Sequence, residues 1–182
     1  MRIISGIARG LKLQTLEGED TRPTLDNVKE AIFSMLFLKC RGSFVLDLFA
    51  GSGAMGIEAL SRGAESAVFV DFNPKACEVI KANLSKAKMT ESASVLNTDF
   101  LKYLKQAGEK ELKFDLVFLD PPYASGFIDK ALELICEHKL LNDGGLIVCE
   151  FDSTTNVDTK KYKVLKDKRY GRVCVNILEA LS

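Results

Sequence analysis

The sequence has no long apolar run, no paired cysteine motif and no net charge. No apolar stretch approaches the roughly 18–20 residues that a membrane helix needs, and residues 1–6 lack the apolar centre of a signal peptide. The five cysteines are dispersed without a CxxC pair, which is typical of reduced thiols and argues against structural zinc. Basic and acidic residues both number 25, so any binding of nucleic acid must come from local patches. We expect a cytoplasmic protein with no metal and no contact with a membrane.

Histidine and candidate nucleophiles are equally scarce. His138 is the only histidine and falls within a helical pattern, so we interpret it as structural. No Pro-Cys pair occurs, and this disfavours a cysteine nucleophile of the kind that attacks C5 of a pyrimidine. What is present is a chain of 182 residues, 47% of them hydrophobic. That is enough for a single domain, residues 1–182, with a substantial core.

Strand-like and helical patterns alternate along the chain, without an internal repeat or a low-complexity linker. Alternation of this kind predicts an α/β fold with a mostly parallel sheet covered by helices on both faces. The last two strands have no helix between them, so they should pair antiparallel. Thr24 is the expected N-cap of the first helix. The expected strands are 44–49, 67–71, 93–96, 114–120, 146–150, 162–166 and 173–179, and the expected helices are 25–38, 54–62, 74–87, 100–107 and 128–138.

A glycine turn after the first expected strand predicts a ligand site. Gly51, Gly53 and Gly56 have the spacing of a dinucleotide fingerprint, and Asp71 follows about 20 residues later as an acid that could hold a ribose. The glycines alone indicate only that a ligand approaches the backbone closely. Asp47 is more specific, because a carboxylate would repel a pyrophosphate but attract an ammonium group. The pattern therefore favours S-adenosylmethionine, which carries both an ammonium group and a ribose diol.

A second motif, Asp120-Pro121-Pro122-Tyr123, closes the expected strand at 114–120. The carboxylate of Asp120 can accept a hydrogen bond from an amine, and the prolines fix the backbone while leaving carbonyls free to accept. The Tyr123 ring can stack on a planar target. The tetrapeptide alone is equally compatible with a proline turn that closes a core strand.

Four acids fall at or just past expected strand ends, where α/β sheets bind ligands. Each could be a loop cap, but together they predict one site. Asp47 and the glycine turn would hold the methionine end, and Asp71 the ribose. Phe72 would pack on adenine, and Asp99 with the Phe100 N–H would read its edge. The predicted cofactor-binding residues are Asp47, Phe49, Gly51, Gly53, Asp71, Phe72, Asp99 and Phe100, and the predicted catalytic residues are Asp120, Pro121, Pro122 and Tyr123.

The chain resembles the bacterial 16S rRNA (guanine-N2)-methyltransferase family of the RsmD type. Residues 47–53 and 120–123 carry motifs that many amino-methyltransferases share, whereas residues 2–13 and 21–30 are more specific to this family. The resemblance implies a class I S-adenosylmethionine-dependent methyltransferase fold, Rossmann-like, with seven strands of which the last is antiparallel. It implies methylation of a guanine amine in 16S rRNA or in an assembling small subunit, by a monomer. The family often has Phe where this chain has Tyr123, and the stacking face is retained.

The acid-free start of the chain suggests how RNA would be held. Residues 1–16 are expected to form a small basic hairpin ahead of a catalytic core at 17–182. The predicted RNA-binding residues are Arg2, Arg9, Lys12 and Arg22. A second basic run, residues 160–172, is equally compatible with a solvated face.

Other activities remain open at this stage. A DNA adenine-N6 methyltransferase would use a similar motif but usually needs a large target-recognition region. A protein glutamine-N5 methyltransferase generally has Asn at the Asp120 position. A nicotinamide-dependent oxidoreductase fits the glycines but not Asp47 or Asp120. A non-catalytic cofactor- or RNA-binding module would have little use for an intact Asp-Pro-Pro-Tyr motif.

Overall fold

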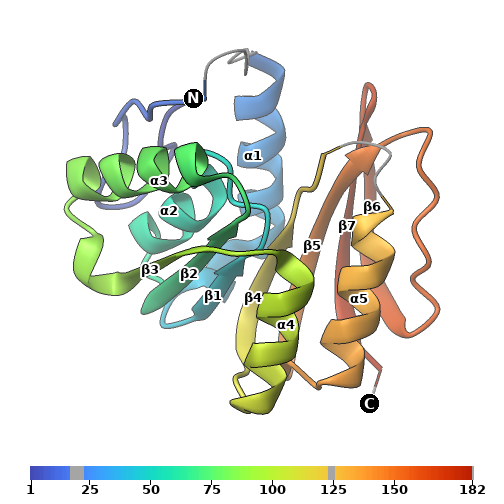
Figure 1. The fold of residues 1–182 in the computed structure, drawn as a ribbon. Coiled ribbons are helices and arrows are strands. Elements are labelled where there is room, and N and C mark those ends of the chain that lie inside the picture. The colour runs from blue at the N-terminus through green and yellow to red at the C-terminus, as the bar shows by residue number, and fades with distance from the viewer. Residues whose placement is uncertain (17–22, 123–125, 182) are drawn as a thin grey trace.

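The protein folds around one seven-stranded sheet with helices on both faces (Figure 1). The computed structural model describes residues 1–16, 23–122 and 126–181, without the side chains of 23–25. The strand order is β3-β2-β1-β4-β5-β7-β6. The first five strands in this order run parallel, and β7 pairs antiparallel with both β5 and β6. The predicted α/β architecture, including the antiparallel final pair, is confirmed.

The elements follow the predicted alternation closely. The strands are β1 (Phe44–Asp47), β2 (Ser66–Asp71), β3 (Ala93–Asn97), β4 (Phe114–Leu119), β5 (Leu141–Asp152), β6 (Tyr162–Tyr170) and β7 (Val173–Ala180). The α-helices are α1 (Pro23–Leu36), α2 (Ala54–Ser61), α3 (Pro74–Ala87), α4 (Phe100–Glu109) and α5 (Phe127–Glu137), and short 3-10 helices cover Phe37–Cys40 and Thr90–Ser92.

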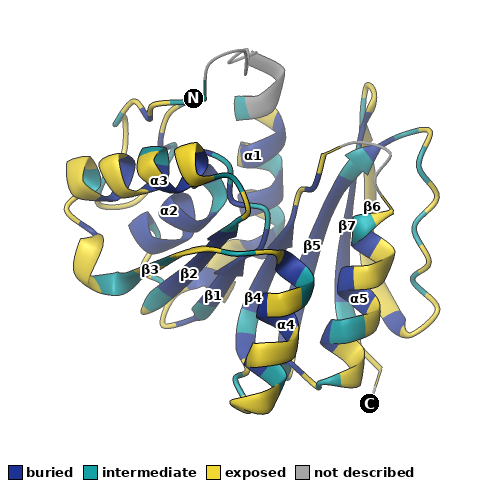
Figure 2. Ribbon diagram, viewed as in Figure 1, coloured by how far each residue is buried: buried dark blue, intermediate teal, exposed yellow. Residues whose placement is uncertain are grey.

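Two hydrophobic cores sandwich the sheet, because side chains alternate between its faces. On β4, Leu116 and Phe118 point into the core beneath α1, α2 and α3. Val117 and Leu119 point into the core beneath α4 and α5. The central strands are buried on both sides (Figure 2). Among the described residues, no helix combines the length and the apolar character needed to cross a membrane.

Several boundaries differ from the sequence-based prediction, among them the starts of α1 and β5. Helix α1 begins at Pro23, so the prediction that Thr24 is its N-cap is wrong; proline fits the first helical turn because its missing N–H is not needed there. Strand β5 begins at Leu141 rather than at 146. Its pairing with β4 shifts register between Phe114 and Leu116, and Gly144 sits in the left-handed region (φ 72°). The polar residues 142–145 therefore form an irregular start of the strand.

The N-terminal segment, residues 1–16, folds back on itself and docks onto α2 and α3. Arg2 and Lys12 form a single antiparallel bridge, so the predicted hairpin is shorter than a two-stranded ladder. The segment is anchored by Glu58, which is fully buried and accepts from the backbone N–H groups of Ile4 (2.8 Å) and Ser5 (3.1 Å). Asn83 of α3 adds two further hydrogen bonds to the Gln14 backbone. The segment is thus part of the folded core.

Candidate active site

A large cavity lies at the carboxyl ends of β1, β2 and β4 and beside Glu150 of β5. Its volume is about 920 Å³, at the upper end of the usual range for ligand pockets. In the sheet, β1 lies between β2 and β4, so the strand order reverses there. Open α/β sheets bind ligands at this kind of switch point. The cavity is lined by Asp47, Phe49, Gly51, Asp71, Phe72, Asp99, Phe100, Asp120, Pro121 and Pro122, all predicted from the sequence, and by Glu150 and Lys29 among others.

Asp47 ends β1 inside this cavity, with only 3% of the residue exposed. One of its carboxylate oxygens accepts from the Gly56 N–H at 2.9 Å. Burial, and then the charges of Asp120 and Asp71, raise the pKa of Asp47 to about 7, although the Gly56 hydrogen bond opposes the shift. A nearby cation would stabilise the ionised form of a carboxyl group that is buried beside other carboxylates. This environment fits the ammonium group of S-adenosylmethionine.

The glycine turn owes its shape to three different constraints. Gly51 (φ 54°) and Gly53 (φ 78°) adopt left-handed backbone angles that side chains disfavour. Gly56 lies so close to β2 that an added Cβ would stand 2.3 Å from the Phe69 ring. Helix α2 can therefore pack tightly against the sheet and direct its first turn at the cavity.

Asp71 and Asp99 already make backbone hydrogen bonds. Asp71 accepts from Gly51 N (2.9 Å) through one oxygen and from Asn73 N (2.8 Å) through the other. Asp99 caps α4, accepting from Leu101 N and Lys102 N through a single oxygen. A carboxylate oxygen can accept two hydrogen bonds. Both side chains thus retain acceptor capacity for hydroxyl or amine donors, and their predicted contacts with ribose and adenine stay predictions.

Aromatic rings form one wall of the cavity. Phe49 packs against Phe100 with ring centroids 5.0 Å apart and stacks on Phe127 at 6.2 Å. Phe100 is buried, so its predicted role would fall to its backbone N–H. Phe72 is 71% exposed at the cavity edge. Such an exposed ring is available to pack on an adenine face, as predicted.

At the end of β4, the proline motif borders the same cavity. Pro121 is buried, whereas Asp120 and Pro122 are exposed. Tyr123, the fourth predicted catalytic residue, lies outside the described residues, as does Arg22. The structure brings Asp120, Pro121 and Pro122 together with Asp47 and Asp71 around one space, as the sequence predicted.

Sequence reasoning missed several residues of the site. Glu150 lies near the end of β5, beside Asp120, and is 9% exposed; the available signal was an acid at the end of the fifth expected strand, 146–150. Lys29 is 3% exposed, and burial lowers its pKa although the partner Glu58 opposes the shift. Met1, Thr15 and Leu16 also line the cavity, so the N-terminal segment reaches the site.

The remaining candidates lie elsewhere. Arg2, Arg9 and Lys12 are exposed on the N-terminal segment. His138 lies at the C-cap of α5, beside Gly108 of α4, at the opposite end of that helix from the cavity. All five cysteines are unpaired thiols. In residues 1–16, 23–122 and 126–181, no group of three His, Cys, Asp or Glu side chains is arranged to hold a metal.

Comparison with known proteins identifies the family of this chain. A family model described as conserved hypothetical protein 95 matches residues 1–179. Ribosomal RNA small subunit methyltransferase D of Haemophilus influenzae is 38% identical over 181 residues, covering 98% of this chain and 93% of the relative. The Escherichia coli protein of the same name is 32% identical, and the match covers 98% of this chain and 89% of that relative. The solved Escherichia coli protein yhhF has a TM-score of 0.86 at 32% identity, covering 99% of this chain and 97% of its own.

The fold and the site together define a class I S-adenosylmethionine-dependent methyltransferase. Within that class, the chain belongs to the family of ribosomal RNA small subunit methyltransferase D. The predicted family, enzyme class and cofactor are confirmed.

Proposed function

We propose that this protein transfers the methyl group of S-adenosylmethionine to the exocyclic N2 amine of a guanine in 16S rRNA. The observation that carries the proposal is the Asp120-Pro121-Pro122 motif at the end of β4, facing the same cavity as Asp47 and Asp71. The family of rRNA methyltransferases to which the chain belongs supports rRNA as the substrate class. A monomeric state and a cytoplasmic location stay predictions.

The cavity supplies a complementary partner for each end of the cofactor. Asp47 would pair with the ammonium group, and the Gly51–Gly53 turn would accommodate the methionine end. Asp71 would accept from the ribose hydroxyls, while Phe72, Asp99 and the Phe100 N–H would hold adenine. When bound, the cofactor supplies an activated methyl group on a sulfonium.

The proline motif would position the acceptor amine. Asp120 and a carbonyl of Pro121 or Pro122 would accept its two hydrogens, which favours a more tetrahedral nitrogen with an available lone pair. Positioning of this kind can contribute roughly 7–11 kcal/mol. Tyr123 would stack on the base. The amine proton can leave after transfer, and a base within a helix would have to be flipped out at a cost of a few kcal/mol.

The N-terminal segment would dock the RNA, with residues 17–182 as the catalytic core. Arg2, Arg9 and Lys12 are exposed on a segment whose backbone is fixed by Glu58 and Asn83. Such residues would contact phosphates and set position without reading sequence. Deletion of the segment would be a poor test. It would remove two backbone donors to the buried Glu58 carboxylate and part of the cavity wall, so a loss of cofactor binding would not report on RNA docking.

Neutralising the three exposed cations should weaken RNA binding and its dependence on salt. The triple variant Arg2→Gln, Arg9→Gln, Lys12→Gln should lower the slope of log affinity against log salt by up to about 2, since each phosphate contact contributes about 0.7 for single strands. Filter binding of rRNA across a salt series measures the slope. Cofactor affinity, measured by calorimetry, should stay within about threefold because none of the three side chains lines the cavity.

A charge-matched control separates docking from net charge. Lys105 and Lys110, in and just after α4, and Lys130 of α5 are also exposed, on elements that cover the opposite face of the sheet (Figure 1). Their triple change to Gln alters net charge equally and should leave the slope unchanged. Equal slopes for the two triple variants would rule out a docking role for the N-terminal segment.

A further inference from the structure

We propose that Glu150 recognises the target guanine by accepting a hydrogen bond from its N1–H while Asp120 accepts from the neighbouring N2 amine. This inference rests on the proposed function and names a specificity-determining residue for it. Guanine presents N1–H and N2–H side by side on its Watson–Crick edge. A pair of adjacent carboxylates matches that pair of donors.

The register of the sheet places the two carboxylates side by side. Leu119 of β4 pairs in parallel with Cys149 of β5. The next residues therefore lie opposite one another, Asp120 just past the end of β4 and Glu150 within β5, on strands spaced about 4.8 Å apart. Both residues line the large cavity, so both reach the space in which the acceptor amine must sit.

Glu150 differs in its hydrogen bonds from two nearby acids, Asp152 and Asp129. It is 91% buried (9% exposed), and no residue in the described part of the chain donates a hydrogen bond to its carboxylate. By contrast, Asp152, two residues further on, accepts from Thr154 N at 3.0 Å and pairs with Arg172 at 3.1 Å. Asp129 accepts from Asp158 N at 2.9 Å. Glu150 is largely buried yet lines the cavity, so a ligand there that brings a hydrogen-bond donor can offset the cost of burying its carboxylate.

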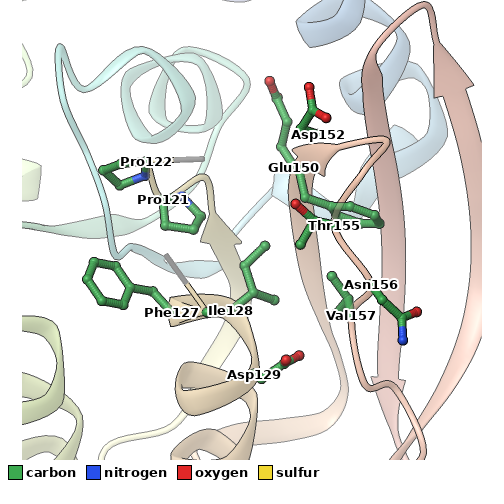
Figure 3. Close-up of a pocket in the computed structure, with 12 residues that line it drawn as sticks. Pro121, Pro122, Phe127, Ile128, Asp129, Glu150, Asp152, Thr155, Asn156 and Val157 are labelled. Carbon is green, nitrogen blue, oxygen red and sulfur yellow. The ribbon is translucent and has the colours of Figure 1, made fainter. Parts of the chain in front are cut away.

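The surroundings of Glu150 fit a flat ring. Figure 3 shows Glu150 rising from β5 on one side of a hollow, with Pro121 and Pro122 on the other side. Phe127 adds an aromatic wall. These four residues line both this hollow and the large cavity, so they form the boundary between the cofactor space and the hollow. A base held there would have its amine at Asp120 and its ring against the prolines.

The electrostatics around Glu150 also favour a ligand that brings hydrogen-bond donors. Burial first, and then the Asp120 carboxylate, raise the pKa of Glu150 well above its ordinary value. The protein alone therefore stabilises the ionised form of Glu150 poorly, and hydrogen-bond donors from a ligand would stabilise it. Guanine supplies two donors to the pair. Adenine presents an acceptor at N1 and carries its amine at C6, so it would face Glu150 with a lone pair.

The test exchanges hydrogen-bond donor and acceptor in two places: at N1 of the target base in the RNA and at residue 150 in the protein. The substrate is small-subunit rRNA ligated from synthetic RNA, with either guanine or 2-aminopurine at the nucleotide that the wild-type protein methylates. 2-Aminopurine keeps the N2 amine but has an acceptor at N1. The wild-type protein should methylate guanine about tenfold or more faster than 2-aminopurine, a ratio within the range for one base contact. Glu150→Gln can donate to that acceptor and should bring the two single-turnover rates within about threefold.

Asp152→Asn is the matched control, since it changes a partnered acid on the same strand. Its guanine preference should equal that of the wild-type protein, and thermal unfolding should show that both variants fold. An unchanged guanine preference in Glu150→Gln, including an equal loss on both RNAs, would overturn the inference while leaving the proposed function standing. Absence of methylation of guanine by the wild-type protein would instead overturn the proposed function.

Discussion

Replacing Asp120 with alanine should lower the rate of methyl transfer at least about 100-fold, while cofactor affinity changes by no more than about threefold. Asp120 would hold the acceptor amine in line with the methyl group, and a displacement of about 1 Å in such an arrangement can cost 10²-fold. In the proposed site the cofactor would have its own partners in Asp47 and Asp71, on different strands. Single-turnover transfer of labelled methyl to rRNA measures the rate, and calorimetry measures the affinity.

Two variants control this experiment. Asp120→Asn keeps a carbonyl acceptor at the same place and should retain more activity than the alanine variant. Asp143→Ala removes an exposed acid at the start of β5, remote from the cavity lining, and should transfer methyl at the wild-type rate. A wild-type rate in Asp120→Ala would show that the assigned role is wrong.

Cofactor affinity should weaken roughly 100-fold as the pH falls from 7 to 5. The protein alone holds the pKa of Asp47 at about 7, chiefly through burial. An ammonium group stabilises the ionised form, so binding requires Asp47 to lose its proton. Affinity is therefore complete above pH 7 and declines about tenfold per pH unit below it. Calorimetry with S-adenosylmethionine between pH 5 and 8 measures the slope, and NAD should not bind at any of these values.

The variant Asp47→Asn tests whether Asp47 alone causes the dependence of cofactor affinity on pH. Asp71, Asp120 and Glu150 also face the cavity and remain in this variant. The variant should bind at least about tenfold more weakly at pH 8, yet with little change between pH 8 and 5. A flat profile for the wild-type protein, or the same slope in the asparagine variant, would contradict the ammonium assignment.

The residues that the sequence predicted best are those whose chemistry is local. Gly51 and Gly53 mark left-handed turns, and Asp47 ends the strand before them, so the motif carries its own geometry. Asp71 follows at a spacing set by one helix and one strand. Because the carboxyl ends of parallel strands lie at one edge of the sheet, the sequence was enough to predict that these side chains form one site.

The features that the sequence did not reveal depend on distant contacts. Glu150 is buried because β5 lies between β4 and β7, and nothing within residues 146–150 marks it as different from a surface acid at a strand end. Lys29 and Glu58 meet at 3.4 Å through the packing of α1 on α2. Strand β6 extends to Tyr170, beyond the predicted end at residue 166. It is an edge strand in which charged residues are exposed, so its sequence lacks the apolar alternation from which a strand is predicted.

Identification of the methylated nucleoside tests the central claim most directly. Small-subunit rRNA from cells that lack this protein would be incubated with the purified protein and S-adenosylmethionine carrying an isotopically labelled methyl group, then digested to nucleosides and analysed by mass spectrometry. The account predicts labelled N2-methylguanosine with the wild-type protein and none with Asp120→Ala. Label in N6-methyladenosine, or label only in an added DNA or protein substrate, would contradict it.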